Sequence, residues 1–270
     1  MKKVNIIIIA LILCNVSFAQ KIYISGGAAY SFQAPSANNG IRVTDATSTT
    51  ASYESVKSKL AAGVHPQITI GYFLNKYAAF EISTGYHFGS KQSIENQMFV
   101  SSISYSQRNE QSIQYGFINP CFVINPGFEK WNPYLGLGAF IGYSNQMTEE
   151  ITNSNSQYFR RYTSSGGSQF GFFGKLGLNY KLNSNWHIYS ELSFSNAAWA
   201  PEKKHLNAAK NDSGTDVYEG MKAHDLLTEY KEEYKHGNPG IPDMSKSQKK
   251  LKFSIPLDFV SLGIGISYSF

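Results

Sequence analysis

The sequence has little cysteine, little charge and no long apolar run. Its only two cysteines are Cys14 and Cys121, too few for the disulfide framework of a small secreted domain. Charged residues make up 16% of the chain, against roughly 25% in ordinary soluble domains. No stretch reaches the roughly 18 consecutive apolar residues that indicate a membrane-spanning helix. These absences argue against a disulfide-rich scaffold and a helical membrane protein.

The first residues have the layout of a secretory signal peptide. Lys2 and Lys3 give a positive start, the apolar run Ile6–Leu13 follows, and Ala19 supplies a small residue before the cleavage site. A run of this length is far too short to span a membrane, which disfavours an uncleaved anchor. We predict a signal peptide over residues 1–19, followed by a single exported domain.

Cys14 leaves one alternative open, which is lipidation of the leader. A bacterial lipobox has small residues just before its cysteine, and Leu13 departs from that pattern. Simple cleavage would leave Cys121 as the only cysteine. It would also remove Lys2 and Lys3, which lowers the formal net charge from +5 to +3. So mild a positive balance gives no reason to expect a nucleic-acid partner.

Aromatic residues and period-two alternation are what the sequence has in abundance. Tyr and Phe number 18 each, and apolar and polar residues alternate in eight separate stretches, as in half-buried strands. The predicted strands are residues 22–32, 64–74, 80–88, 112–124, 134–143, 170–182, 186–194 and 260–270. The last of them sets alternating apolar residues against Ser and Gly; the apolar ones are Val260, Leu262, Ile264, Ile266, Tyr268 and Phe270.

The connections between these strands are alternately long and short. Those after the second, fourth and sixth strands are short turns, and the others are long and polar. Trp131 and Trp186 lie beside short turns, where an aromatic belt at the periplasmic side is expected. We therefore predict an all-β fold over residues 20–270: an eight-stranded antiparallel transmembrane β-barrel with short periplasmic turns and long extracellular loops.

Over nearly all of its exported part, the chain resembles small outer-membrane β-barrel proteins of the OmpA/OmpX type, as found in Bacteroidota. The resemblance includes the terminal aromatic residues Tyr268 and Phe270 at alternate positions. In such proteins this pair is a C-terminal signal for the barrel-assembly machinery, which the resemblance implies as a partner. It also implies a bacterial outer-membrane location, and it brings no catalytic residues with it.

Strand parity predicts which side chains point into the barrel. Lipid-facing residues must be apolar, so the opposite parity marks the lumen. The predicted lumen residues carry both signs of charge: Gln67, Thr69, Glu81, Ser83, His87, Asn119, Lys175, Asn179, Lys181, His187, Tyr189 and Glu191. Register across the turn 183–185 predicts an ion pair of Lys175 with Glu191, which Glu81 joins across the lumen. We interpret this polar cluster as structural, because eight strands leave an interior that side chains fill; a proton or solute path is the alternative.

Possible catalytic and cofactor motifs are weak. The glycines between Gly136 and Gly142 alternate within one strand, whereas a phosphate-binding loop needs a helix after it. His187 shares a face with Tyr189 and Glu191, but it follows a periplasmic turn, far from the outer rim where a surface enzyme would act. His87 has only glycines beside it on its face. We predict no catalytic residue, no cofactor and no metal site.

The segment 201–250 is the longest connection. Its apolar residues Ala223, Leu226, Leu227, Tyr230 and Tyr234 fit helical spacing, with Asp216 and Glu219 placed as a cap, so we expect a short amphipathic helix over the barrel mouth. His205, His224 and His236 match no metal-ligand spacing. The lysines at 246, 249, 250 and 252 could contact lipopolysaccharide phosphates, or could simply keep the loop base soluble.

The sequence thus favours a non-enzymatic outer-membrane barrel. We expect its outer loops to contact an unknown surface partner or to help maintain the envelope, in contact with outer-membrane lipid and lipopolysaccharide. One alternative is a narrow OmpW-like transport barrel for small hydrophobic solutes. Another is an enzyme acting on lipid A or peptides. A diffusion porin is disfavoured, because an aqueous channel needs about 16 strands.

Overall fold

The computed structural model describes residues 22–34, 38–44, 52–57, 59–100, 103–154, 156–233 and 243–270. The predicted signal peptide and Cys14 lie outside these residues. Among those described, no helix is long and apolar enough to cross a membrane.

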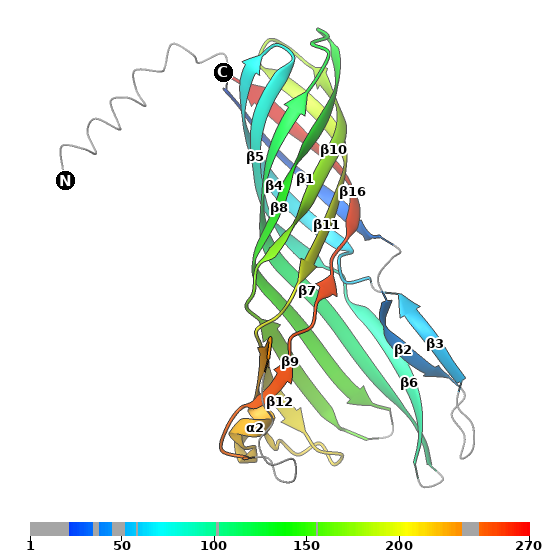
Figure 1. Cartoon of the computed structure of the whole chain (residues 1–270). Helices are drawn as coiled ribbons and strands as arrows, with labels where there is room; N and C mark the ends of the chain where they lie inside the picture. Colours follow the sequence, from blue (N-terminus) through cyan, green and yellow to red (C-terminus); the bar gives the residue numbers. More distant parts are fainter. Residues whose placement is uncertain are drawn as a thin grey trace, which may run out of the picture.

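Eight long strands close into a barrel (Figure 1). They are β1 (Ile22–Gln33), β4 (Gly63–Asn75), β5 (Ala78–Gly89), β7 (Ile103–Ile124), β8 (Trp131–Asn153), β10 (Gln169–Lys181), β11 (Trp186–Trp199) and β16 (Phe259–Ser269). Each pairs antiparallel with the next, and β16 returns to pair with β1 from Tyr23–Ser269 to Gln33–Phe259. The predicted eight-stranded antiparallel barrel and all eight of its strands are confirmed.

The short turns gather at one end of the barrel, where Figure 1 also places the C-terminus. They connect β4 to β5, β7 to β8 and β10 to β11. The second of these turns was predicted to run through Pro133, which is wrong: β8 already begins at Trp131, and Pro133 pairs with Leu178. Trp131 packs against Tyr180 and Trp186 against Tyr268, at ring-centroid distances of 4.4 and 4.9 Å. These contacts form the aromatic belt at the short-turn end.

The outer surface of the barrel is apolar, as a lipid-facing wall must be. Ile68, Leu137 and Ile264 are 57%, 51% and 68% exposed in the middle of their strands. At the end away from the short turns, Tyr30 packs edge-on against Phe32, and Tyr86 packs at a tilt against Phe88. The lipid-facing band is therefore bordered by aromatic residues at both ends.

Two prolines interrupt the β4–β5 and β7–β8 ladders of the barrel. No pair is formed between Val64–Phe88 and Gln67–Gly85, around Pro66 in β4. Likewise, none is formed between Ile118–Ile141 and Cys121–Gly138, around Pro120 in β7. Proline has no N–H to donate, so each ladder loses a bond at this level.

Beyond the barrel, β7 and β8 continue outward and carry further strands with them (Figure 1). β6 (Gln92–Val100) pairs with β7, and β9 (Phe159–Ser165) pairs with β8. β12 (Lys203–Lys210), β13 (Leu227–Lys231) and β14 (Gln248–Leu251) extend the sheet from β9. β2 (Asn38–Thr44) and β3 (Ser52–Lys57) form a separate hairpin, and β15 (Ile255–Pro256) pairs with β11. Much of what was expected to be loop is thus an ordered extension, which we call the outer sheet (β6, β9, β12–β14 and the outer ends of β7 and β8).

The predicted amphipathic helix in segment 201–250 is wrong. The segment has one 3-10 turn, η2 (Tyr218–Gly220), and one α-helical turn, α2 (Ala223–Leu226). Leu227 then begins β13, which pairs with β12, and the Tyr230 N–H donates to the Glu202 carbonyl. Tyr230 packs on Phe253 at 5.1 Å instead of on a helix face. The open edge of β12 offers backbone partners that outweigh helical spacing. Tyr234 and His236 lie outside the described residues.

Candidate functional site

The three residues predicted to form a polar cluster meet in the lumen near the short-turn end. Gly177 is the partner of Glu191 across the β10–β11 ladder, which places Lys175 one diagonal step away. The Lys175 Nζ lies 3.2 Å from Glu191 Oε2 and also donates to a carboxylate oxygen of Glu81 on β5. All three side chains are 5–7% exposed. The barrel therefore encloses two carboxylates bound to one ammonium group.

Two tyrosines complete this cluster. The Tyr23 hydroxyl donates to Glu81 Oε1, and the Tyr134 hydroxyl donates to Glu191 Oε2 at 2.9 Å. Lys175 Nζ also lies 5.3 Å from the centre of the Tyr134 ring. A buried carboxylate needs such donors because water is excluded from it. Sequence reasoning missed both tyrosines, although the inward parity of polar hydroxyls beside two lumen carboxylates was a usable signal.

Lumen glycines make room for these rings. A Cβ added to Gly71 would lie within 2.0 Å of the Tyr23 ring, and one added to Gly177 within 2.2 Å of the Tyr134 ring. Tyr189 takes the space above Gly27 and Gly265 in the same way. The small inward residues of the strands thus leave the space that the large inward side chains occupy.

A cavity of 110 Å³ adjoins the cluster and extends to the short turns. Its lining includes Glu81, Lys175 and Glu191 on one side, and Lys130 and Lys181 near the turns. This volume holds only a few water molecules. The predicted lumen residues Gln67, Thr69, Asn179, His187 and Tyr189 also line it.

Aromatic side chains fill the outer half of the lumen. His87 stacks on Tyr115 at 4.6 Å, and Phe117 stacks on Phe140 at 6.1 Å. His65 packs edge-on against Phe117 and bonds to Ser31 Oγ through Nδ1 at 3.0 Å. We call this group the aromatic plug; it comprises His65, His87, Tyr115, Phe117, Phe140 and Phe259. Together with the ion cluster, it closes the barrel at two levels.

His87 and His187, two of the histidines noted in the sequence, lie at different levels of the barrel, on β5 and at the start of β11. Within the described residues, neither ring nitrogen of His87 has a hydrogen-bond partner. His187 is half-buried at the short-turn end, and the Glu191 on its face is bound by Lys175 and Tyr134. In the part of the chain that the structure describes, no three His, Cys, Asp or Glu side chains are grouped to hold a metal ion.

A second charged cluster, unanticipated from sequence, lies in the outer sheet. Glu149 on β8 binds the Lys204 ammonium from β12 and accepts hydrogen bonds from Asn109 Nδ2 at 2.7 Å and Gln111 Nε2 at 3.1 Å. Burial alone would raise the pKa of Glu149, but Lys204 and these donors outweigh it and lower that pKa. The cluster therefore ties β8 to β12 across the intervening β9, beside a hollow of 160 Å³.

The lysine run near residue 250 lies at the outer sheet and is partly neutralised. Lys246 Nζ is 3.0 Å from Asp243, and Lys252 Nζ is 3.8 Å from Glu232. Lys249 and Lys250 are exposed on β14. Half of the predicted phosphate-binding run is thus paired with carboxylates of its own chain.

The closed barrel, its apolar outer wall and its polar, filled lumen define a small bacterial outer-membrane β-barrel protein. Comparison with protein families agrees. Residues 17–217 match the outer membrane protein beta-barrel domain, and the chain belongs to that family. The predicted location in the bacterial outer membrane is confirmed. A search of curated proteins found no match.

Solved structures of three outer-surface or outer-membrane proteins are similar to this chain. Neisserial surface protein A is 12% identical, with 92% of this chain and 97% of that chain covered and a TM-score of 0.37. The attachment invasion locus protein Ail of Yersinia pestis is 12% identical, with 93% and 98% covered and a TM-score of 0.40. OprG of Pseudomonas aeruginosa is 16% identical, with 93% and 96% covered and a TM-score of 0.43.

Proposed function

We propose that this outer-membrane barrel is a non-enzymatic protein that contacts a partner at the cell surface through its outer sheet. The observation that carries the proposal is the filled lumen. The Lys175 cluster and the aromatic plug leave a cavity of only 110 Å³ at the short-turn end. A barrel that is filled in this way has its accessible chemistry outside the membrane.

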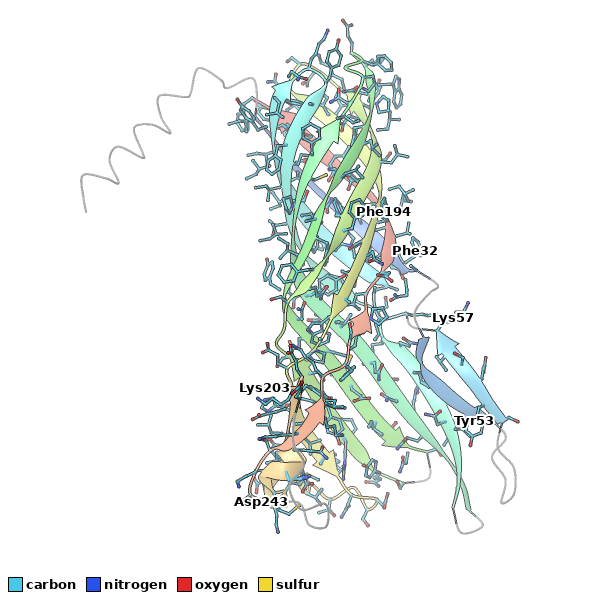
Figure 2. The ribbon with its side chains drawn as sticks, viewed as in Figure 1. Phe32, Tyr53, Lys57, Phe194, Lys203 and Asp243 are labelled. Atoms are coloured by element: carbon cyan, nitrogen blue, oxygen red, sulfur yellow. The ribbon has the colours of Figure 1, made fainter. Side chains whose placement is uncertain are left out.

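The outer sheet has the form of a contact surface. It ends on one side in β6 and on the other in β14, and both are edge strands of the main sheet. An edge strand carries backbone N–H and C=O groups that a partner strand can pair with. On the β2–β3 hairpin beside this sheet, Figure 2 labels Tyr53, which is 71% exposed.

A comparison of adhesion by two forms of the protein tests the proposal. Trp199 and Ile255 are antiparallel partners, so a short turn can join β11 to β15. Cells displaying the full chain should adhere to an extracellular-matrix or epithelial surface better than cells displaying a variant in which residues 201–253 are replaced by Asn-Gly. Equal adhesion, with equal amounts of folded barrel at the surface, would refute a surface contact made through residues 201–253, the part of the outer sheet that holds β12–β14.

Single-channel recording separates this function from the transport alternative. The full barrel in planar bilayers should show no stable conductance steps, because both levels of the lumen are blocked. Regular steps that persist in the form lacking residues 201–253 would instead favour a narrow transport barrel. The enzymatic alternative predicts that the purified barrel modifies lipid A or cleaves peptides; we expect both substrates to be unchanged.

A further inference from the structure

We propose that Lys57, Lys59 and Lys91 form a binding site for the phosphate groups of lipopolysaccharide in the outer leaflet. We call these three residues the lysine collar. The inference is independent of the proposed surface contact, because it concerns the lipid beside the barrel and not a partner beyond it.

A buried glutamine brings the collar together. The Gln92 side chain is 7% exposed; its Oε1 accepts from the Lys59 N–H at 2.8 Å, and its Nε2 donates to the Lys57 carbonyl at 2.9 Å. Lys91 immediately precedes Gln92. The turn is further held by Ser90, whose N–H donates to the Ala62 carbonyl at 2.7 Å. The backbone of three lysines from two segments is thus fixed around one side chain.

The height of the collar matches the headgroup layer of the membrane. Phe88 is 50% exposed at the outer end of the lipid-facing band, and Lys91 follows three residues later. β5 ends at Gly89, so Lys91 lies in the connection to β6; three residues span at most about 10 Å even when fully extended, so Lys91 lies within that distance of Phe88. The polar layer outside the hydrocarbon is about 5–8 Å thick on each side. Figure 2 shows Lys57 beyond Phe32 along the barrel axis, on the side away from the short turns.

The charged residues of this region that lie nearest the lipid are the three lysines. The acidic residues of β3, β6 and β7 lie further from the membrane. Lys91 Nζ is 3.6 Å from Glu110, but Lys91 is 68% exposed and Arg108 also pairs with Glu110 at 3.2 Å. An exposed pair of this kind is weak and leaves the ammonium available. Glu95 and Glu54 lie further from the barrel along β6 and β3.

No ion pair is formed by Lys57 or Lys59 with another described residue. Asp258, which precedes β16, has its carboxylate bound within its own strands: its Oδ1 accepts from Asn196 Nδ2 at 3.0 Å and from the Ala197 N–H at 3.1 Å. Anionic lipid headgroups should gather on the β4–β6 side, since each lysine near a charged membrane surface adds to the attraction.

Titration of diphosphoryl lipid A into the purified full-length barrel in neutral detergent micelles tests the site. The triple variant Lys57→Ala, Lys59→Ala, Lys91→Ala should bind lipid A on the order of 100-fold more weakly. The matched control is Lys203→Ala, Lys210→Ala, Lys222→Ala, which removes the same charge from exposed lysines of β12 and of the segment that follows it. The control should bind as the unmodified protein does, and heat-dependent gel mobility should show that both variants are folded.

Three results would overturn the proposal. They are an equal loss in the control, equal binding of lipid A from which the phosphates have been removed, and full competition by millimolar inorganic phosphate. The last would indicate a site for free anions and not for a lipid. If the alanine variant does not fold, replacing all three lysines with arginine must preserve the affinity, and Lys59→Glu alone must reduce it.

Discussion

At the residue scale, strand register predicts the central ion pair of the lumen cluster but not the contacts of the tyrosines around it. Period-two parity pointed Lys175 and Glu191 inward, and the short turn 183–185 set their diagonal spacing, so their contact was predictable. The contacts of Tyr23 and Tyr134 were not, because parity gives the direction of a side chain but not its partner across a closed barrel. The clearance over Gly71 and Gly177 that admits their rings depends on the three-dimensional closure.

Lys175→Met should destabilise the barrel by about 3–5 kcal/mol, because it leaves Glu81 and Glu191 as buried carboxylates without their cation. The temperature at which unboiled protein loses its folded gel mobility would measure this, and assembly itself should persist. Lys181→Met is the matched control, since Lys181 is exposed at the short-turn end. No difference between the two variants would contradict a structural role for the cluster. Adding Glu81→Gln and Glu191→Gln to Lys175→Met should recover part of the loss.

Phe270→Ala tests the proposed assembly signal. The Phe270 ring is 51% exposed and packs on Tyr268 at 5.0 Å. Its loss should therefore change the melting temperature of refolded barrel only slightly, since little surface is buried there. If the assembly machinery reads this ring, the amount of barrel in cellular outer membranes should fall several-fold. A parallel loss of stability and surface amount would instead indicate a packing role.

At the scale of elements, strand alternation predicted the membrane part and failed outside it. A strand that faces lipid on one side must be apolar on that face, so alternation in the sequence predicts β4 and β11. The outer ends of β7 and β8 have no lipid-facing side, and residues such as Gln107 and Glu150 carry no such pattern. The helical spacing of the apolar residues before Tyr230 also gave a wrong prediction. There, backbone pairing with β12 decides the conformation.

Glu149→Gln should loosen the pairing of β9 with β12 at neutral pH by about 1–3 kcal/mol, because Lys204 loses its carboxylate. The pKa of Glu149 is lowered in the folded protein, so its contribution is present above its ordinary value of 4.5 and is lost as the pH falls through the lowered value. Hydrogen exchange of β12 amides should accelerate in the unmodified chain as the pH falls through the lowered pKa of Glu149, below 4.5, and less so in the variant. Glu150→Gln, on the opposite face, is the control; an equal effect there would refute the assignment.

At the scale of the whole molecule, the barrel is closed by eight strands and needs none of the outer sheet. Every barrel strand has its two neighbours without β9, β12, β13 or β14. The form in which Asn-Gly replaces residues 201–253 should therefore keep its heat-dependent gel mobility, with a melting temperature within a few degrees of the full chain. A barrel that no longer folds without this segment would show that the outer sheet is part of the folding unit.

The seam between β1 and β16 has a consequence for how the protein is made. Its eleven residue pairs, from Tyr23–Ser269 to Gln33–Phe259, join segments more than 220 positions apart in the chain. Such long-range pairing is slow, because most of the loop entropy is lost before the contacts form. Until the last strand arrives, β1 has an open edge that lipid cannot satisfy. The barrel can therefore close only when β16 has been made. In a polypeptide that ends before β16, the edge of β1 stays unpaired, and we expect periplasmic proteases to degrade it.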